Sequence, residues 1–234
     1  MSAGMKQQSV PGALRKARDA LLDILYPEEA VCRACGAIAS GGCLCRRCRE
    51  ELHDTGFAFS WEVTEVDGVQ AWSLRPYGGV AKQLVIRLKH GAEACLAREL
   101  ASLVHPLPAV PRFAPDTVVT WVPMPEARKR ERCIDHGERL ARAVAEELGL
   151  CCRPLLRRTN QKGPTQATLN REQREKNLKG AFSPVETFCF PVLLVDDVLT
   201  TGTTARRCIE ALRQGGAADI SILAVTRTQR NPSQ

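Results

Sequence analysis

Residues 192–204 read VLLVDDVLTTGTT, and this stretch decides the fold. The apolar run at 192–195 predicts a short strand buried on both faces, as in parallel sheets. The residues after it lead into a helix predicted at about 203–214, which ends at Gly215 and Gly216. The strand therefore delivers two adjacent carboxylates, Asp196 and Asp197, to its carboxyl end, where ligands bind in open α/β sheets.

The turn at 200–204 has the chemistry of an anion-binding loop. Gly202 permits close approach of the backbone, and N–H groups at a helix start attract phosphate. The carboxylates of Asp196 and Asp197 suit vicinal sugar hydroxyls, or Mg²⁺ held through water. A turn that only caps a helix does not account for the hydroxyl donors around the glycine, which are Thr200, Thr201, Thr203 and Thr204. A phosphorylated ribose offers every group that this loop would bind.

The segments on both sides of this stretch repeat the alternation of strand and helix. Apolar runs predict strands at 118–122 and 220–225, with a helix at about 136–148 between the first of these and 192–195. Towards the amino end, a strand is predicted at 69–77, followed by helical periodicity over 80–104 that is interrupted near His90 and Gly91. The predicted class is α/β, with a mostly parallel sheet flanked by helices. The absence of GxxxxGK[ST] and GxGxxG sequences argues against P-loop and dinucleotide sites.

The charge and the apolar pattern narrow the location and the ligand. The 234 residues carry a net charge of +7, and residues 126–180 alone hold 14 Lys or Arg against 8 Asp or Glu. A concentrated basic stretch predicts a polyanion site, for which pyrophosphate and nucleic acid both qualify. The sequence lacks a membrane-spanning apolar run and a secretory signal pattern, so we expect a cytoplasmic protein without membrane insertion.

Five of the 11 cysteines fall between residues 32 and 48. In a reducing compartment, paired CxxC sequences are typical of metal ligands, with disulfide or redox use as the alternative. Four thiolates would complete a tetrahedral, structural Zn²⁺ site, and they come from the pairs Cys32, Cys35 and Cys45, Cys48. Cys43 is a candidate substitute ligand, but Cys45 keeps the two-residue spacing to Cys48. We expect the other six cysteines to be small core residues.

The strand, the Asp-Asp pair and the threonine loop resemble the 5-phosphoribosyl-1-pyrophosphate (PRPP) signature of type I phosphoribosyltransferases. From the cysteine cluster to the last strand, the chain is similar to the competence protein F (ComF) family. Three further segments support this resemblance: Pro76 to Gly79 with Leu88 to Gly91, Trp121 to Pro125 with Arg128 to Arg132, and Gln166 to Phe182. The chain departs from the family at 132–136, where Cys133 and Ile134 replace a usual glycine and aromatic residue, and at His90, which replaces an aromatic residue.

The resemblance implies a role for each part of the site. The PRPP-binding residues would be Asp196, Asp197, Thr200, Thr201, Gly202, Thr203 and Thr204. The pyrophosphate and its Mg²⁺ would lie against Lys89, Arg130 and Arg132, under a lid at 158–180 that contributes Arg171 or Arg174. The alternative for Lys89 is that it extends along its helix into solvent. We expect His136 to be a surface residue rather than a general base. The catalytic base stays unassigned.

The implied function is phosphoribosyl transfer from PRPP to an unknown acceptor, in competence, DNA uptake or the use of external DNA. The alternative is a non-enzymatic factor that keeps the PRPP fold and binds single-stranded DNA. Aromatic residues make up only 5% of the chain, which weakens the case for a base-stacking groove. A competence helicase or another uptake protein is a further candidate partner.

The expected domain division follows from these segments. An amino-terminal helix would occupy 1–29, a four-cysteine zinc module 30–56, and a phosphoribosyltransferase-like domain 57–230. Residues 231–234 would form a disordered tail.

Overall fold

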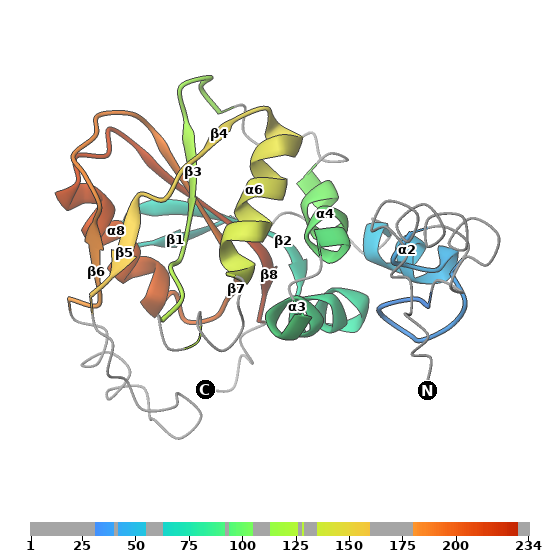
Figure 1. Cartoon of the computed structure of the whole chain (residues 1–234). Helices are drawn as coiled ribbons and strands as arrows, with labels where there is room; N and C mark the ends of the chain where they lie inside the picture. Colours follow the sequence, from blue (N-terminus) through green and yellow to red (C-terminus); the bar gives the residue numbers. More distant parts are fainter. Residues whose placement is uncertain are drawn as a thin grey trace, which may run out of the picture.

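The computed structural model of the chain describes residues 31–39, 42–54, 63–91, 94–104, 113–125, 128, 135–159 and 180–228. Its centre is a six-stranded sheet in the order β1-β2-β8-β7-β3-β4, drawn in Figure 1. The strands are β1 (Thr64–Val66), β2 (Val69–Pro76), β3 (Val118–Trp121), β4 (Cys151–Cys152), β7 (Val192–Leu199) and β8 (Ile220–Arg227).

Every pair of neighbours in this sheet is parallel except β1 and β2, which form an antiparallel hairpin. β7 lies between β3 and β8, so its carboxyl end is at the middle of the sheet edge. A separate two-stranded sheet pairs β5 (Leu156–Arg158) with β6 (Phe182–Pro184). The predicted α/β class with a mostly parallel sheet is therefore confirmed.

Alternate side chains of β7 face two different apolar cores. Leu193 and Val195 pack with α3 (Gly79–Gly91), α4 (Ala94–Ala101), the short helix η1 (Ser102–Val104) and α6 (His136–Leu148). Val192 and Leu194 pack with α8 (Thr203–Gln214) and the β5–β6 sheet on the other face. Figure 1 shows this division, with α3, α4 and α6 on one side of the sheet and α8 on the other. Burial on both faces explains why the strand reads as a continuous apolar run.

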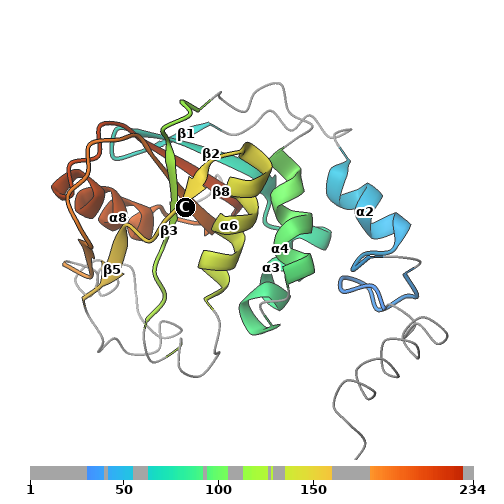
Figure 2. The same ribbon diagram turned by 45° about the horizontal axis from the view of Figure 1, so that its top comes forward.

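The cysteine-rich segment adjoins the first of these cores. Its helix α2 (Arg46–His53) lies beside α3 and α4, at the end of the molecule remote from α8 (Figure 2). Leu44, Cys48 and Leu52 are buried in the same apolar cluster as the residues of α3 and α4. The segment thus contributes its few apolar side chains to the larger core.

The long elements agree closely with the pattern in the sequence. The helices predicted at 136–148 and 203–214 have those bounds, and the interruption near Gly91 separates α3 from α4. β7 is longer than the predicted 192–195, because Asp196, Val198 and Leu199 continue the ladder with β8. The predicted helix at 1–29 and tail at 231–234 lie outside the described residues, and the domain limits stay a prediction.

Cys208 is buried as expected, whereas Cys151 and Cys189 are exposed, so the expectation that these two belong to the core is wrong. In the described part of the chain, no helix combines the length and apolarity needed to cross a membrane.

Candidate functional site

The carboxyl end of β7 places a buried carboxylate at the centre of the sheet edge. Asp197 is 8% exposed, and Asp196 beside it is half-buried. Two side chains hold the backbone of this strand end: Thr226 Oγ1 of β8 donates to the Asp197 carbonyl at 2.9 Å, and Asp197 N donates to Asp196 Oδ1 at 2.9 Å.

Two helices supply the partners of the Asp197 side chain. Lys89 Nζ, in the last turn of α3, lies 3.1 Å from Asp197 Oδ1. His136 Nε2, at the first residue of α6, lies 3.3 Å from Asp197 Oδ2. Asp135 fixes the start of α6 because its side chain caps the helix, accepting from Gly137 N at 3.0 Å and Glu138 N at 3.3 Å. A buried carboxylate is thus held between side chains that are distant in the sequence.

These surroundings move the pKa values of the two carboxyl groups in opposite directions. Burial and the neighbouring Asp197 charge raise the pKa of Asp196 from 3.8 to about 7. Burial acts on Asp197 in the same direction, but His136 and Lys89 outweigh it and lower the pKa of Asp197 below 3.8. Near neutral pH the pair therefore carries one firm negative charge and one group close to its titration point.

The loop after β7 presents unpaired donors at the start of α8. Gly202 is the N-cap residue, with φ 75°, and no side chain caps this helix start. A Cβ at Gly202 would lie 3.2 Å from Val66 Cγ1, so both the backbone angle and the space favour glycine. Thr200 and Thr201 are exposed, and Thr201 Oγ1 lies 2.9 Å from Thr203 Oγ1. Because the first turn also holds no acidic residue, it can accept an anion.

The structure brings together all of the predicted loop residues, the two aspartates and Lys89 at one edge of the sheet. Arg130, Arg132, Arg171 and Arg174 lie outside the described residues, as do Cys133 and Ile134, and their roles stay predictions.

His136 is the residue of this site that the sequence interpretation missed. We expected a surface residue, but its side chain is only 19% exposed and contacts Asp197. The signal in the sequence was its position at a helix start on the carboxyl side of a parallel strand, since such positions share an edge with the end of the next strand. The alternative that the Lys89 side chain extends into solvent is also wrong, because its ammonium group pairs with Asp197.

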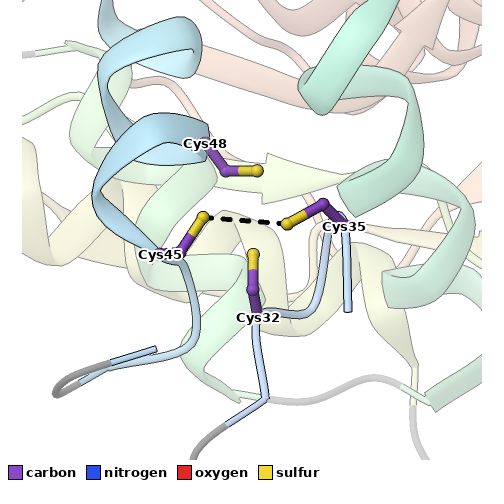
Figure 3. Close-up of side chains that lie close together, drawn as sticks. All are labelled: Cys32, Cys35, Cys45 and Cys48. Atoms are coloured by element: carbon purple, nitrogen blue, oxygen red, sulfur yellow. Dashed lines mark hydrogen bonds between the residues drawn. The ribbon is translucent and has the colours of Figure 1, made fainter. Parts of the chain in front are cut away.

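A second cluster lies in the cysteine-rich segment. The Sγ atoms of Cys32, Cys35, Cys45 and Cys48 all lie within 4.8 Å of one another, and Figure 3 shows them pointing to a common centre. The turn that carries the first pair is closed by Cys32 N donating to Ala37 O at 2.7 Å, and the second pair stands at the start of α2. This four-cysteine cluster therefore depends on one turn and one helix start.

The dimensions of the four-cysteine cluster suit a tetrahedral metal ion. Metal–sulfur bonds of about 2.3 Å imply sulfur–sulfur edges of about 3.8 Å, and Cys35 Sγ lies 3.7 Å from Cys45 Sγ. Burial opposes ionisation of Cys32, but hydrogen bonds from the backbone of Cys35, Cys45 and Ala34 lower its pKa to about 6. Burial and the neighbouring thiols raise the pKa of Cys48, so the ligand-free cluster favours one thiolate. A thiolate is the form that binds a metal.

Cys43 stands apart from the four-cysteine cluster. Its thiol hydrogen bonds with Cys95 of α4, and burial together with this contact raises the pKa of Cys43 to about 12. Among the described residues, it is not part of the metal-compatible group. The choice of Cys45 over Cys43 as the third ligand agrees with this geometry.

The fold and these two sites define an α/β protein with two carboxylates and an uncapped helix start at the carboxyl end of β7, and with an attached four-cysteine cluster. No protein-family model matches the chain. DNA utilization protein YhgH of Salmonella typhi and that of Salmonella typhimurium are each 31% identical to it over 117 residues, which cover 49% of this chain and 50% of the relative. The match thus spans about half the length of these relatives.

Two solved structures overlap the chain at low similarity. Glutamine PRPP amidotransferase from B. subtilis has 20% identity and a TM-score of 0.36, covering 76% of this chain and 30% of that one. Adenine phosphoribosyltransferase has 18% identity and a TM-score of 0.34, covering 58% and 72%. TM-scores at this level do not establish a common fold. The homology to the DNA utilization proteins, the mostly parallel sheet and the four-cysteine cluster fit the ComF-like architecture predicted from the sequence.

The substitution Asp196→Asn is expected to stabilise the ligand-free protein increasingly as pH rises. The pKa of Asp196 is about 7 in the folded state, and its ordinary value is 3.8. At pH values between these two, Asp196 therefore holds a proton in the folded state that it has released in the unfolded state. Stability therefore falls with rising pH in the wild type, and asparagine removes this loss. The free energy of unfolding of Asp196→Asn minus that of the wild type should therefore increase by about 1 kcal/mol between about pH 6 and about pH 8.

Urea unfolding of both proteins at the two pH values measures this difference. Titration of the cysteine cluster cancels, since both proteins carry it. A difference that stays constant or narrows would contradict the raised pKa of Asp196.

Proposed function

We propose that this chain binds PRPP at the carboxyl end of β7 and transfers its phosphoribosyl group to an acceptor. The observation that carries the proposal is the combination of two carboxylates at the strand end with an uncapped helix start directly after them. A 5-phosphate bound by the 200–204 loop would lie beside ribose hydroxyls facing Asp196 and Asp197. A 5-phosphoribosyl group joins a phosphate to vicinal hydroxyls, which is the combination that these two features would bind.

The side chains around Asp197 indicate on which side of the aspartate pair the pyrophosphate would lie. Lys89 approaches Asp197 from α3 and His136 from α6, and both helices pack on the same face of the sheet, so nitrogen donors gather on that side of the aspartate pair. The pyrophosphate would lie on that side, with Arg130 and Arg132 following β3 and with Arg171 or Arg174 closing over it. Mg²⁺, when bound with PRPP, would neutralise part of the pyrophosphate charge. Lys89 would orient the leaving group, which is the kind of positioning and charge stabilisation that accelerates such transfers.

The biological role is proposed from the relatives. The matched proteins are named DNA utilization proteins, and a role in competence, DNA uptake or the use of external DNA follows for this chain as part of the proposal. The acceptor is not identified by any described residue. We propose a cytoplasmic location, where PRPP is available.

The second candidate function is non-enzymatic binding of single-stranded DNA. The homology to DNA utilization proteins favours it, and the basic stretch at 126–180 could contact a phosphate backbone. The same edge of the sheet could serve both functions if the loop binds any terminal phosphate.

We propose further that the four-cysteine cluster holds a structural Zn²⁺. Four thiolates leave no open coordination position, so the ion would stabilise the fold rather than take part in transfer. Residues 31–54 contribute few buried apolar side chains of their own, and metal binding would compensate for this small core.

Cys35→Ser is expected to lose bound zinc and to lower the midpoint of thermal unfolding, because a hydroxyl is a poor zinc ligand at neutral pH. Cys43→Ser is the matched control, since Cys43 lies in the same segment but contacts Cys95. Elemental analysis and thermal unfolding of both variants measure the effect. Full zinc content in Cys35→Ser would contradict the ligand assignment. A loss of zinc in Cys43→Ser as large as that in Cys35→Ser would contradict it as well.

Asp197→Asn is expected to weaken PRPP binding by about 10- to 100-fold, because it removes the charge that orders Lys89 and His136 and that would accept the ribose hydroxyls. Asp116→Asn is the matched control, since Asp116 is exposed at the opposite edge of the sheet, before β3. Calorimetric titration with PRPP and Mg²⁺ measures the affinity, and a labelled oligonucleotide reports DNA binding.

The two candidate functions give different outcomes in this experiment. PRPP affinity that survives Asp197→Asn contradicts the proposed site. Loss of both ligands would indicate one shared polyanion pocket, and loss of PRPP alone would separate the sites. If the wild type binds PRPP but releases no pyrophosphate across a panel of nucleobases and amines, the enzymatic proposal fails.

A further inference from the structure

Helix α2 connects the cysteine cluster to the PRPP-site helix α3. Cys45 is its N-cap residue and Cys48 lies in its first turn, so its start belongs to the four-cysteine cluster. Glu51, one turn further along, accepts a hydrogen bond from Val80 N at 3.1 Å through its Oε1 atom. Val80 lies in the first turn of α3, the helix that packs against α2. One short helix thus contacts both the cluster and the start of α3.

The start of α3 depends on this contact because the helix supplies no acidic residue of its own in the first turn. The first N–H groups of a helix have no partner within it, and a carboxylate there also complements the helix dipole. The approach is close: a Cβ at Gly79, which has φ 48°, would lie 2.6 Å from Glu51 Oε1. Glycine at this position lets the carboxylate of another element reach the helix end.

The other end of α2 is fixed to the sheet by Arg75. This buried residue of β2 donates from Nε to Leu52 O at 2.9 Å and from Nη1 to Leu74 O at 2.8 Å. Because β2 leads directly into α3, α2 is joined to the end of the strand and to the beginning of the helix. It therefore limits how the β2–α3 connection can move.

α3 transmits this constraint to the aspartate pair. Lys89 lies ten residues beyond Gly79, or about 15 Å along the helix axis. Leu84, Val85 and Leu88 are fully buried along the same helix, so α3 can shift only together with its packed face. Any displacement of its start would change where the Lys89 ammonium group lies relative to Asp197 Oδ1, now 3.1 Å away.

We infer that Glu51 is a positioning residue for the PRPP site, through which the cysteine module holds Lys89 at the aspartate pair. The inference rests on the proposed function, since Lys89 is assigned there to the pyrophosphate. It gives the four-cysteine module a role in ligand affinity beyond its own folding.

The test uses the zinc-loaded full chain and a double-mutant cycle. The variants are Glu51→Ala, Glu51→Gln, Lys89→Ala and Glu51→Ala with Lys89→Ala. Glu50→Ala is the matched control, because Glu50 is an exposed residue of the same helix that pairs with Arg46. PRPP affinity by calorimetry and hydrogen exchange of the α3 amides are measured for each, with zinc content as the check on folding.

Glu51→Ala is expected to weaken PRPP binding by about two- to fivefold, and Glu51→Gln, which keeps an acceptor oxygen, by less. In the Lys89→Ala background, Glu51→Ala should not weaken PRPP binding further, because Glu51 acts on the ligand only through Lys89. Glu50→Ala should match the wild type. Unchanged affinity in Glu51→Ala, or an equal loss with and without Lys89, overturns the inference.

Hydrogen exchange separates this inference from the proposed function. If the wild type binds no PRPP, the proposed function fails. Hydrogen exchange can still show whether Glu51 holds α3 in place as far as Lys89. Glu51→Ala should raise exchange along α3 as far as residues 87–91. Faster exchange confined to residues 79–82 would show a local cap only and would overturn the link.

Discussion

The Asp197 carboxylate is the point on which the arrangement of the site depends. A buried charge is costly unless it is paired, and the partners of this one come from α3 and α6, which belong to different parts of the chain. The end of β7, the last turn of α3 and the first residue of α6 must therefore meet at one place. The strand order achieves this meeting, because β7 lies between β3, which precedes α6, and β8, which pairs with the strand that precedes α3.

The two adjacent aspartates have pKa values that are shifted in opposite directions. Burial and the charge of Asp197 raise the pKa of Asp196 to about 7, while His136 and Lys89 lower the pKa of Asp197. Environments that push two carboxyl pKa values apart are typical of sites where one group donates and the other accepts. Such a pair suits two vicinal hydroxyls, and its cost in stability is the kind of loss that functional sites retain.

The parts of this fold that were predictable from the sequence are those encoded within a short segment. The β7 strand, its Asp-Asp pair and the threonine loop lie within 13 residues, and the four clustered cysteines follow from two CxxC spacings. The contacts of His136 with Asp197 and of Glu51 with Val80 were not predictable, since each depends on how helices pack across the sheet. Short strands such as β4 and β5 were missed too, because two or three residues are too few to show an apolar pattern and the strands form only by pairing with β3 and β6.

A crystal structure of the chain with Mg²⁺ and PRPP tests the proposed binding site most directly. We expect the 5-phosphate against the backbone of residues 200–204, the ribose hydroxyls at Asp196 and Asp197, and the pyrophosphate on the Lys89 side. Ligand bound elsewhere, or a loop at 200–204 left empty at saturating PRPP, would contradict the proposed site.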